Sequence, residues 1–153
     1  MAVSSCGLTS GGSHGPIPRI PHAVVVVTMK EYRLDYERPV PGGRVVFRVV
    51  NAGRYVHRLS MLPLPEDFPP IDQQLRGRQR RVVAPLAGVP GLRPGSSDSF
   101  AVDLVPGQRY GVVDLSGNPN GQSNALLGMA SEFRAGGGRP GPRARPSPSA
   151  KGP

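Results

Sequence analysis

The chain has 153 residues, of which 37% are hydrophobic and only one, Cys6, is a cysteine. This composition provides for one domain with a single core and excludes a disulfide framework, a paired-thiolate metal site and a transmembrane helix, since no run of about 18 apolar residues occurs. The formal net charge of +9 favours a polyanionic partner, but four basic groups follow residue 135, so the body of the chain is only mildly basic.

Residues 1–22 are rich in Gly, Ser and Pro and predict a flexible tether. Within them, Val3-Ser4-Ser5-Cys6-Gly7 resembles the lipidation box of bacterial lipoproteins, in which the cysteine carries the lipid. The basic and apolar residues that precede such a box are not in the sequence. One interpretation is a signal peptide encoded upstream, which makes the protein extracytoplasmic and anchored to the membrane only through lipid on Cys6. The alternative is a chance cysteine in a cytoplasmic protein.

Residues 23–61 predict short strands, because β-branched and aromatic side chains alternate with polar ones between turn-forming residues. The predicted strands in this part cover residues 24–27, 32–36, 44–50 and 55–61. The third of them ends at Asn51-Ala52-Gly53, a turn signal. The fourth places His57 on the same face as Tyr55, Leu59 and Met61, so the imidazole should point in the same direction as apolar neighbours.

Residues 63–81 form a long connection that predicts a crossover or a surface insert. Pro69-Pro70 favours a short helix through residues 72–75. The connection closes with four arginines that either contact a polyanion or form a solvated loop: Arg76, Arg78, Arg80 and Arg81. No aromatic side chains are interleaved with them and no nucleic-acid motif accompanies them, which disfavours nucleic acid as the partner.

The remaining sequence predicts Pro/Gly turns over residues 82–97 and strands over residues 98–104, 109–115 and 126–134. Residues 136–153 contain ten Gly or Pro and no large apolar group, which predicts a disordered tail. The fold expected for residues 23–135 is therefore all-β: a single antiparallel Greek-key β-sandwich of about seven or eight strands with at most one short helix.

The order of several landmarks resembles the cupredoxin-like family of copper proteins, over about residues 23–135. A strand ends in Asn51-Ala52-Gly53, His57 follows four residues later, Pro106-Gly107 precedes a strand with Tyr110, and Gly128-Met129 precedes the last strand. The resemblance implies a copper site formed by one histidine after the Asn/Gly turn and by a cysteine, a second histidine and a methionine from the loop between the last two strands.

Placed on this sequence, the implied ligand positions are His57, Asp114, Asn124 and Met129. Asp114 stands where the resemblance implies a cysteine, and Asn124 where it implies the second histidine. A blue-copper centre depends on a thiolate bond, which neither a carboxylate nor an amide can replace. We therefore expect a degenerate site without cofactor, in which Asp114 accepts a hydrogen bond from His57, Asn124 completes the network and Met129 packs in the core.

Two alternatives remain open: a non-blue copper or zinc site formed by His57, Asp114 and Asn124, and an electron-transfer cupredoxin. A basic polyanion-binding protein is a third. No nucleophile motif and no phosphate loop occur, so we expect no enzymatic activity. The sequence thus favours a monomeric, non-catalytic binding or structural module of the cell envelope, whose protein or envelope partner it does not name.

Overall fold

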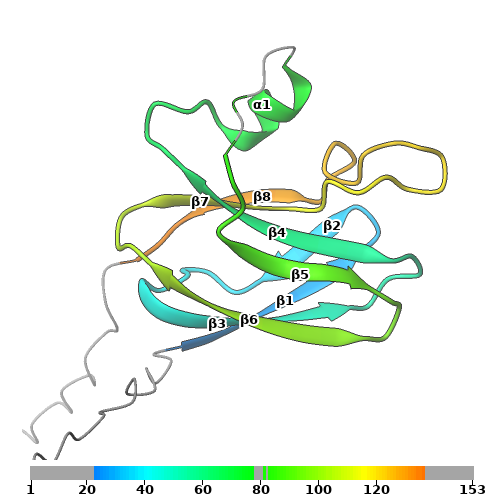
Figure 1. Ribbon diagram of the computed structural model, residues 1–153, viewed down its shortest axis with the longest axis horizontal. Helices are drawn as coiled ribbons and strands as arrows, with labels where there is room; N and C mark the ends of the chain where they lie inside the picture. The colour runs from blue at the N-terminus through cyan, green and yellow to red at the C-terminus, as the bar shows by residue number, and fades with distance from the viewer. Residues whose placement is uncertain (1–22, 78–80, 82, 137–153) are drawn as a thin grey trace, which may run out of the picture.

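The computed structural model describes residues 23–77, 81 and 83–136 (Figure 1). The predicted tether with Cys6, the arginines at 78 and 80, and residues 137–153 of the predicted tail lie outside the described residues. Eight strands and one helix lie within them, and the strands form two four-stranded sheets packed face to face. The predicted all-β sandwich with one short helix is confirmed.

The first sheet has the strand order β2-β1-β3-β6. Its strands are β1 (Ala23–Lys30), β2 (Arg33–Tyr36), β3 (Gly43–Asn51) and β6 (Ser97–Leu104). The pairs β1–β2 and β3–β6 are antiparallel, whereas β1 and β3 run parallel, so this sheet is mixed and not, as the sequence predicted, antiparallel throughout. The parallel register places Met29, near the end of β1, opposite Asn51 at the end of β3.

The second sheet has the strand order β5-β4-β7-β8, with every pair antiparallel. Its strands are β4 (His57–Leu64), β5 (Ala87–Leu92), β7 (Arg109–Val113) and β8 (Ala130–Arg134). The core lies between the two sheets and includes Phe47, Leu59 and Tyr110, each at most 1% exposed. Alternation along the strands directs these side chains inward, as the sequence predicted.

Several strand bounds differ from the sequence-based expectation, among them those of β5, β4 and β8. β5 was expected as turns because its six residues include Gly88, Pro90 and Gly91; proline is tolerated here since β5 is the edge of its sheet. β4 begins at His57 rather than at residue 55, and the Tyr55 side chain is exposed. β8 begins only at residue 130, because the polar loop after β7 is longer than expected.

The long connection between β4 and β5 contains helix α1 (Ile71–Arg76), close to its predicted position. In Figure 1 it lies on the outer side of the second sheet, away from the first. Gly111 leaves room for its approach, because a Cβ there would lie 2.5 Å from the Cδ1 atom of Ile71 and would make that side chain shift. Ile71 and Leu75 cover part of the outer face of β7, and Val113 is consequently fully buried. No described helix is long and apolar enough to cross a membrane.

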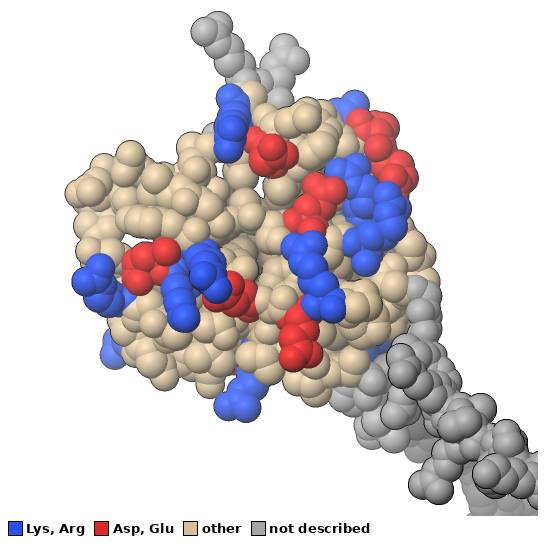
Figure 2. Space-filling model, turned by 180° about the vertical axis from the view of Figure 1, so that it is seen from behind, with Lys and Arg blue, Asp and Glu red and all other residues tan. Residues whose placement is uncertain are grey.

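The surface charges are mixed. Figure 2 shows Lys and Arg side chains next to Asp and Glu side chains on the face behind that of Figure 1. Ion pairs join Arg109 to Glu132 at 2.7 Å and Arg134 to Glu66 at 2.6 Å.

Gly136, the first residue of the predicted tail, donates its backbone N–H to the carbonyl oxygen of Val40 at 2.8 Å.

Candidate functional site

The loop between β7 and β8 closes onto itself through backbone hydrogen bonds. The N–H of Asp114 donates to the carbonyl oxygen of Met129 at 2.9 Å, and the N–H of Met129 donates to that of Asn124 at 2.9 Å. The N–H of Asn124 in turn donates to the carbonyl oxygen of Ser116 at 2.9 Å. These bonds hold Asp114 and Asn124 close together although they are ten positions apart in the sequence.

The side chains of His57, Asp114 and Asn124 meet in the interior. The Nδ1 atom of His57 lies 2.9 Å from Oδ2 of Asp114, and Nδ2 of Asn124 donates to the same oxygen at 3.0 Å. The three residues are 1%, 0% and 2% exposed, respectively. The hydrogen bond that the sequence analysis expected between His57 and Asp114 is therefore present, as is the contribution of Asn124.

The second oxygen of the Asp114 carboxylate is occupied from its own loop. Oδ1 accepts hydrogen bonds from the backbone N–H of Ser116 at 2.9 Å and from the Ser116 hydroxyl. A fully buried carboxylate is costly unless its lone pairs are satisfied, and both oxygens of this one are. An ionised carboxylate only accepts, so this hydrogen bond favours the His57 tautomer that carries its proton on Nδ1.

The other ring nitrogen of His57 lies near a second carboxylate, which the sequence analysis did not identify. Nε2 of His57 lies 3.6 Å from Oε1 of Glu31, which is too long for a hydrogen bond. Nε2 and Oδ1 of Asn124 are both buried without a hydrogen-bond partner among the described residues. The site thus combines a carboxylate whose two oxygens are both hydrogen-bonded with two buried polar atoms that have no hydrogen-bond partner among the described residues.

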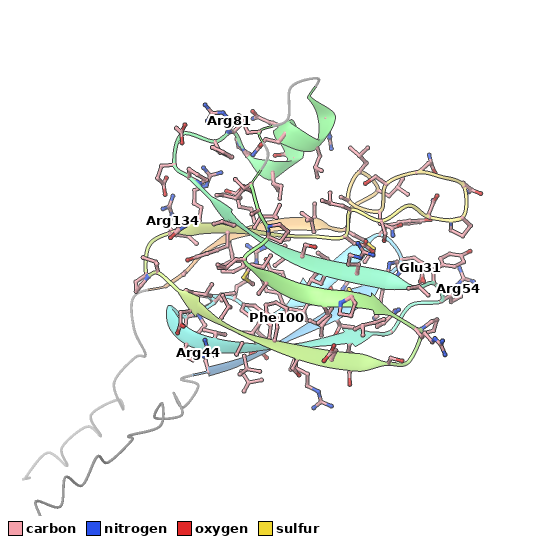
Figure 3. All side chains as sticks on the ribbon, in the orientation of Figure 1. Glu31, Arg44, Arg54, Arg81, Phe100 and Arg134 are labelled. Atoms are coloured by element: carbon pink, nitrogen blue, oxygen red, sulfur yellow. The ribbon has the colours of Figure 1, made fainter. Side chains whose placement is uncertain are left out.

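Glu31 lies in the turn between β1 and β2 and is fixed by the turn that precedes β4 (Figure 3). Its Oε1 accepts the backbone N–H of Arg54 and, at 3.0 Å, that of Tyr55. Partial burial raises the pKa of Glu31, but these backbone hydrogen bonds, together with the His57 side chain, outweigh it and lower the pKa below its usual 4.5. Only the parallel pairing of β1 with β3 would have indicated this proximity, and the sequence gives no sign of that pairing.

Asn51 gives the predicted Asn51-Ala52-Gly53 turn its structural role. Its Oδ1 accepts the N–H of Gly53 at 2.9 Å, and its Nδ2 donates to the carbonyl oxygens of Tyr55 and Leu92, each at 2.8 Å. The side chain is fully buried. This asparagine therefore ties the end of β3 to β5 and to the residues that precede His57, which positions the imidazole at the start of β4.

No protein-family model matches the chain, and no curated protein matches it in sequence. Solved structures that are similar to it in three dimensions include two auracyanins. Dithionite-reduced auracyanin from the photosynthetic bacterium Roseiflexus castenholzii has a TM-score of 0.51 at 16% identity, over 74% of this chain and 95% of that one. Auracyanin B has a TM-score of 0.53 at 14% identity, over 78% and 92%. The chain has a cupredoxin-like fold. At these identities the likeness shows the fold alone.

Within this cupredoxin-like fold, Met129 lies next to the site along the chain but belongs to the hydrophobic core. Its side chain is fully buried in the cluster that contains Leu59, Met61 and Tyr110. Its backbone N–H and carbonyl oxygen close the loop on Asn124 and Asp114, as described above. The packing role that the sequence analysis assigned to Met129 is therefore present in the structure.

The donor set of the site does not fit a blue-copper centre. At the positions where the resemblance implies a thiolate and a second imidazole, Asp114 contributes a carboxylate and Asn124 an amide. Both Asp114 oxygens already accept hydrogen bonds from within the protein. Among the described residues, no group of three or more His, Cys, Asp or Glu side chains is arranged so that it could hold a metal ion.

Of the four arginines singled out as polyanion contacts, the structure describes Arg76 and Arg81. Arg76 is exposed in the last turn of α1. Arg81 donates through Nη1 to the backbone and side-chain oxygens of Asp67, at 3.0 and 2.6 Å, and its guanidinium lies 4.7 Å from the centre of the Phe68 ring. The charge of Arg81 thus has an acidic neighbour within the same connection.

Proposed function

We propose that this protein is a non-catalytic binding or structural module of the cell envelope, in which a hydrogen-bonded network replaces the copper site of the cupredoxin-like fold. The observation that carries the proposal is the buried contact of 2.9 Å between Nδ1 of His57 and Oδ2 of Asp114, which Asn124 extends. A buried polar network of this kind stabilises a single arrangement of the loops around it. The module would present those loops to a protein or envelope partner.

A non-catalytic role is supported by the fact that no hydroxyl or thiol of the described residues is hydrogen-bonded to the imidazole of His57 as a nucleophile would be. The Ser116 hydroxyl donates to Asp114 rather than to His57, so the serine, histidine and aspartate that meet here are not in the order that nucleophilic catalysis requires. His57 is 1% exposed, so a substrate has little access to it. The arrangement supports a role of these residues in holding the surrounding loops in place rather than in catalysing a reaction.

The placement in the cell envelope is supported by the lipoprotein-like box at Cys6. The DNA immediately upstream of the first codon tests this part of the proposal. An in-frame start followed by basic codons and an apolar stretch is the expected finding. A stop codon in frame directly upstream would contradict it and leave a cytoplasmic module.

A second candidate function is the binding of Cu(II) or Zn(II) at a non-blue site. The unpartnered Nε2 of His57 and Oδ1 of Asn124 favour it, because both are buried donors to a cation. Glu31 lies 3.6 Å from that nitrogen and would add a carboxylate. Against it stands the hydrogen bond to Asp114, which uses the carboxylate that such a site would need.

Titration of the purified protein with Cu(II), followed by optical absorption and by the melting temperature, separates the two candidates. The metal-free proposal predicts no stoichiometric rise in the melting temperature. The control is the double variant H14Q/H22Q, which removes the other two histidines of the chain. A stoichiometric rise that persists in this control and is lost in His57→Gln would contradict the proposal and support a metal site.

A further inference from the structure

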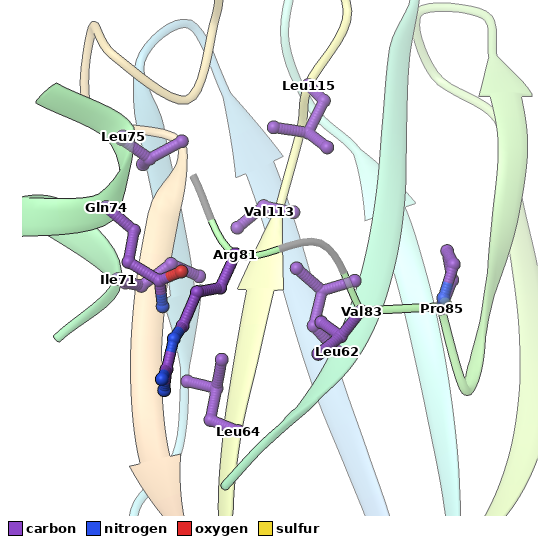
Figure 4. Close-up of a pocket in the computed structure, with 10 residues that line it drawn as sticks. All are labelled: Leu62, Leu64, Ile71, Gln74, Leu75, Arg81, Val83, Pro85, Val113 and Leu115. Carbon is purple, nitrogen blue, oxygen red and sulfur yellow. The ribbon is translucent and has the colours of Figure 1, made fainter. Parts of the chain in front are cut away.

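A second site lies on the outer face of the second sheet, where the connection containing α1 covers it only in part. A pocket of about 280 Å³ opens there between α1, β4, β7 and the residues after Arg81 (Figure 4). Its apolar walls are formed mainly by Leu62, Leu64, Ile71, Leu75, Val113 and Leu115. It is separate from the network around His57 and does not depend on the proposed function of that network.

The pocket exists because β4 and β7 carry apolar side chains on their outer faces where α1 approaches them. The outer face of an antiparallel sheet is usually polar, yet Leu62, Leu64 and Val113 point outward and form a small cluster apart from the main core. Ile71 and Leu75 of α1 cover one side of this cluster. Leu115, at 51% exposure, marks the open side. An apolar concave surface that its own chain leaves partly open is the usual form of a small-molecule site.

Two polar side chains enter this apolar lining, Gln74 and Arg81. In Figure 4 the Arg81 guanidinium lies between the Gln74 amide and Leu64. A guanidinium carries five N–H donors in a planar fork that matches a carboxylate. Within the described chain, Arg81 uses Nη1 for its ion pair with the Asp67 carboxylate, at 2.6 Å, and for the Asp67 carbonyl oxygen, at 3.0 Å, so a ligand carboxylate would have to use its other N–H groups beside this pair. The pocket therefore combines an apolar wall with a cationic group at its edge.

We propose that this pocket binds a medium-chain alkyl carboxylate, with the alkyl chain against Leu62 and Val113 and the carboxylate on Arg81. The volume limits the ligand to roughly ten non-hydrogen atoms at roughly 30 Å³ each, the share of a water molecule in the liquid. Octanoate has this size and this chemistry. A longer acyl chain would extend past Leu115 into solvent.

The test is a calorimetric titration of the full chain with octanoate and, separately, with octan-1-ol, which has the same chain and no charge. We expect saturable one-site binding of octanoate, with methyl NMR shifts confined to the residues of the pocket wall. In Arg81→Gln, octanoate should bind about tenfold more weakly, as expected for a lost hydrogen bond to a charged group, and octan-1-ol should bind as before. Arg58→Gln, an exposed arginine on β4, is the matched control and should leave both unchanged.

Leu115→Trp tests the apolar part without disturbing a buried position, because Leu115 is half exposed at the pocket opening. This variant should bind octanoate and octan-1-ol more weakly, by a similar factor for both ligands. Its melting temperature should stay near that of the wild type. Absence of saturable octanoate binding to the wild type at millimolar concentration would overturn the proposal. Methyl shifts outside the pocket would also overturn it, as would equal octanoate affinity in the wild type and in Arg81→Gln.

Discussion

His57 and Asp114 form a buried pair that joins the start of β4 to the residue after β7. The two atoms, Nδ1 and Oδ2, lie 2.9 Å apart, and the side chains are 1% and 0% exposed. β4 and β7 are neighbours in the second sheet, so the pair connects the ends of two adjacent strands at the point where the loop leaves the sheet. The contact holds the imidazole in place through a carboxylate. The resemblance to cupredoxins implies a thiolate at this position.

Asp114→Ala should destabilise the protein by about 3 kcal/mol, because it leaves buried donors on His57 and Asn124 without their acceptor. Urea denaturation at neutral pH measures the change. Asp103→Ala is the control, since Asp103 pairs with Arg44 at 3.0 Å but is half exposed. It should cost less than about 1 kcal/mol. Equal losses in the two variants would show that the network contributes no more than a surface ion pair.

The double variant D114C/N124H should bind Cu(II) with an intense absorption band in the visible range. It supplies the thiolate and the second imidazole that a blue-copper centre requires, at the positions given by the resemblance. The control is D114A/N124H, which has the imidazole without the thiolate and should show no such band. A folded D114C/N124H that binds copper without the band would mean that position 114 does not correspond to the copper-binding cysteine.

The sequence was informative where local patterns decide the structure. Alternation of apolar and polar side chains predicted the strands that build the core, and the turn at Asn51 correctly placed His57 on the inner face of its strand. The meeting of His57, Asp114 and Asn124 followed from the cupredoxin resemblance rather than from periodicity. The network they form confirms the expected hydrogen bonds.

The sequence was uninformative where contacts depend on pairings between distant segments. Glu31 reaches His57 because β1 and β3 are parallel neighbours, an arrangement that no local pattern encodes. β5 was missed because its Gly and Pro residues read as turns, although proline is compatible with an edge strand. The pocket beside Arg81 depends on how the α1 connection returns over the sheet, which the residue pattern does not determine.

Glu31 should contribute stability that is lost in acid. Its pKa in the folded protein lies below the usual 4.5, so the folded state favours the carboxylate and the contribution is complete above the unfolded-state pKa. It should decline as the pH falls from about 4.5 through the lower folded pKa. The difference in melting temperature between the wild type and Glu31→Gln should therefore be largest near pH 6 and should shrink toward pH 3.

The matched control for that experiment is Glu66→Gln. The pKa of Glu66 is also lowered, chiefly by its hydrogen bond from Arg134, but the side chain is exposed. Salt at 0.5 M should abolish the effect of Glu66→Gln by screening and should leave that of Glu31→Gln largely intact, because backbone N–H groups hold the Glu31 carboxylate. Equal sensitivity to salt would contradict the assignment of the Glu31 shift to those hydrogen bonds.

Gly128 controls how the loop returns to Met129, and its replacement should disturb the network from a distance. Its φ of +127° is unfavourable for other residues, and a Cβ at this position would collide with the backbone carbonyl oxygen of Tyr32. Gly121, with φ of +77°, has no atom within 4 Å of the corresponding Cβ position. Gly121→Ala should therefore cost about 1 kcal/mol through backbone strain alone, and Gly128→Ala about 3 kcal/mol.

Amide hydrogen exchange distinguishes the two glycine variants at the site itself. Displacement of Gly128 should weaken the hydrogen bond from the N–H of Asp114 to the carbonyl oxygen of Met129, so the Asp114 amide should exchange faster in Gly128→Ala than in Gly121→Ala. Urea denaturation supplies the free energies for comparison. Equal exchange at Asp114 in both variants would mean that the contact with Tyr32 is relieved locally and that the loop does not transmit the strain to the His57–Asp114 pair.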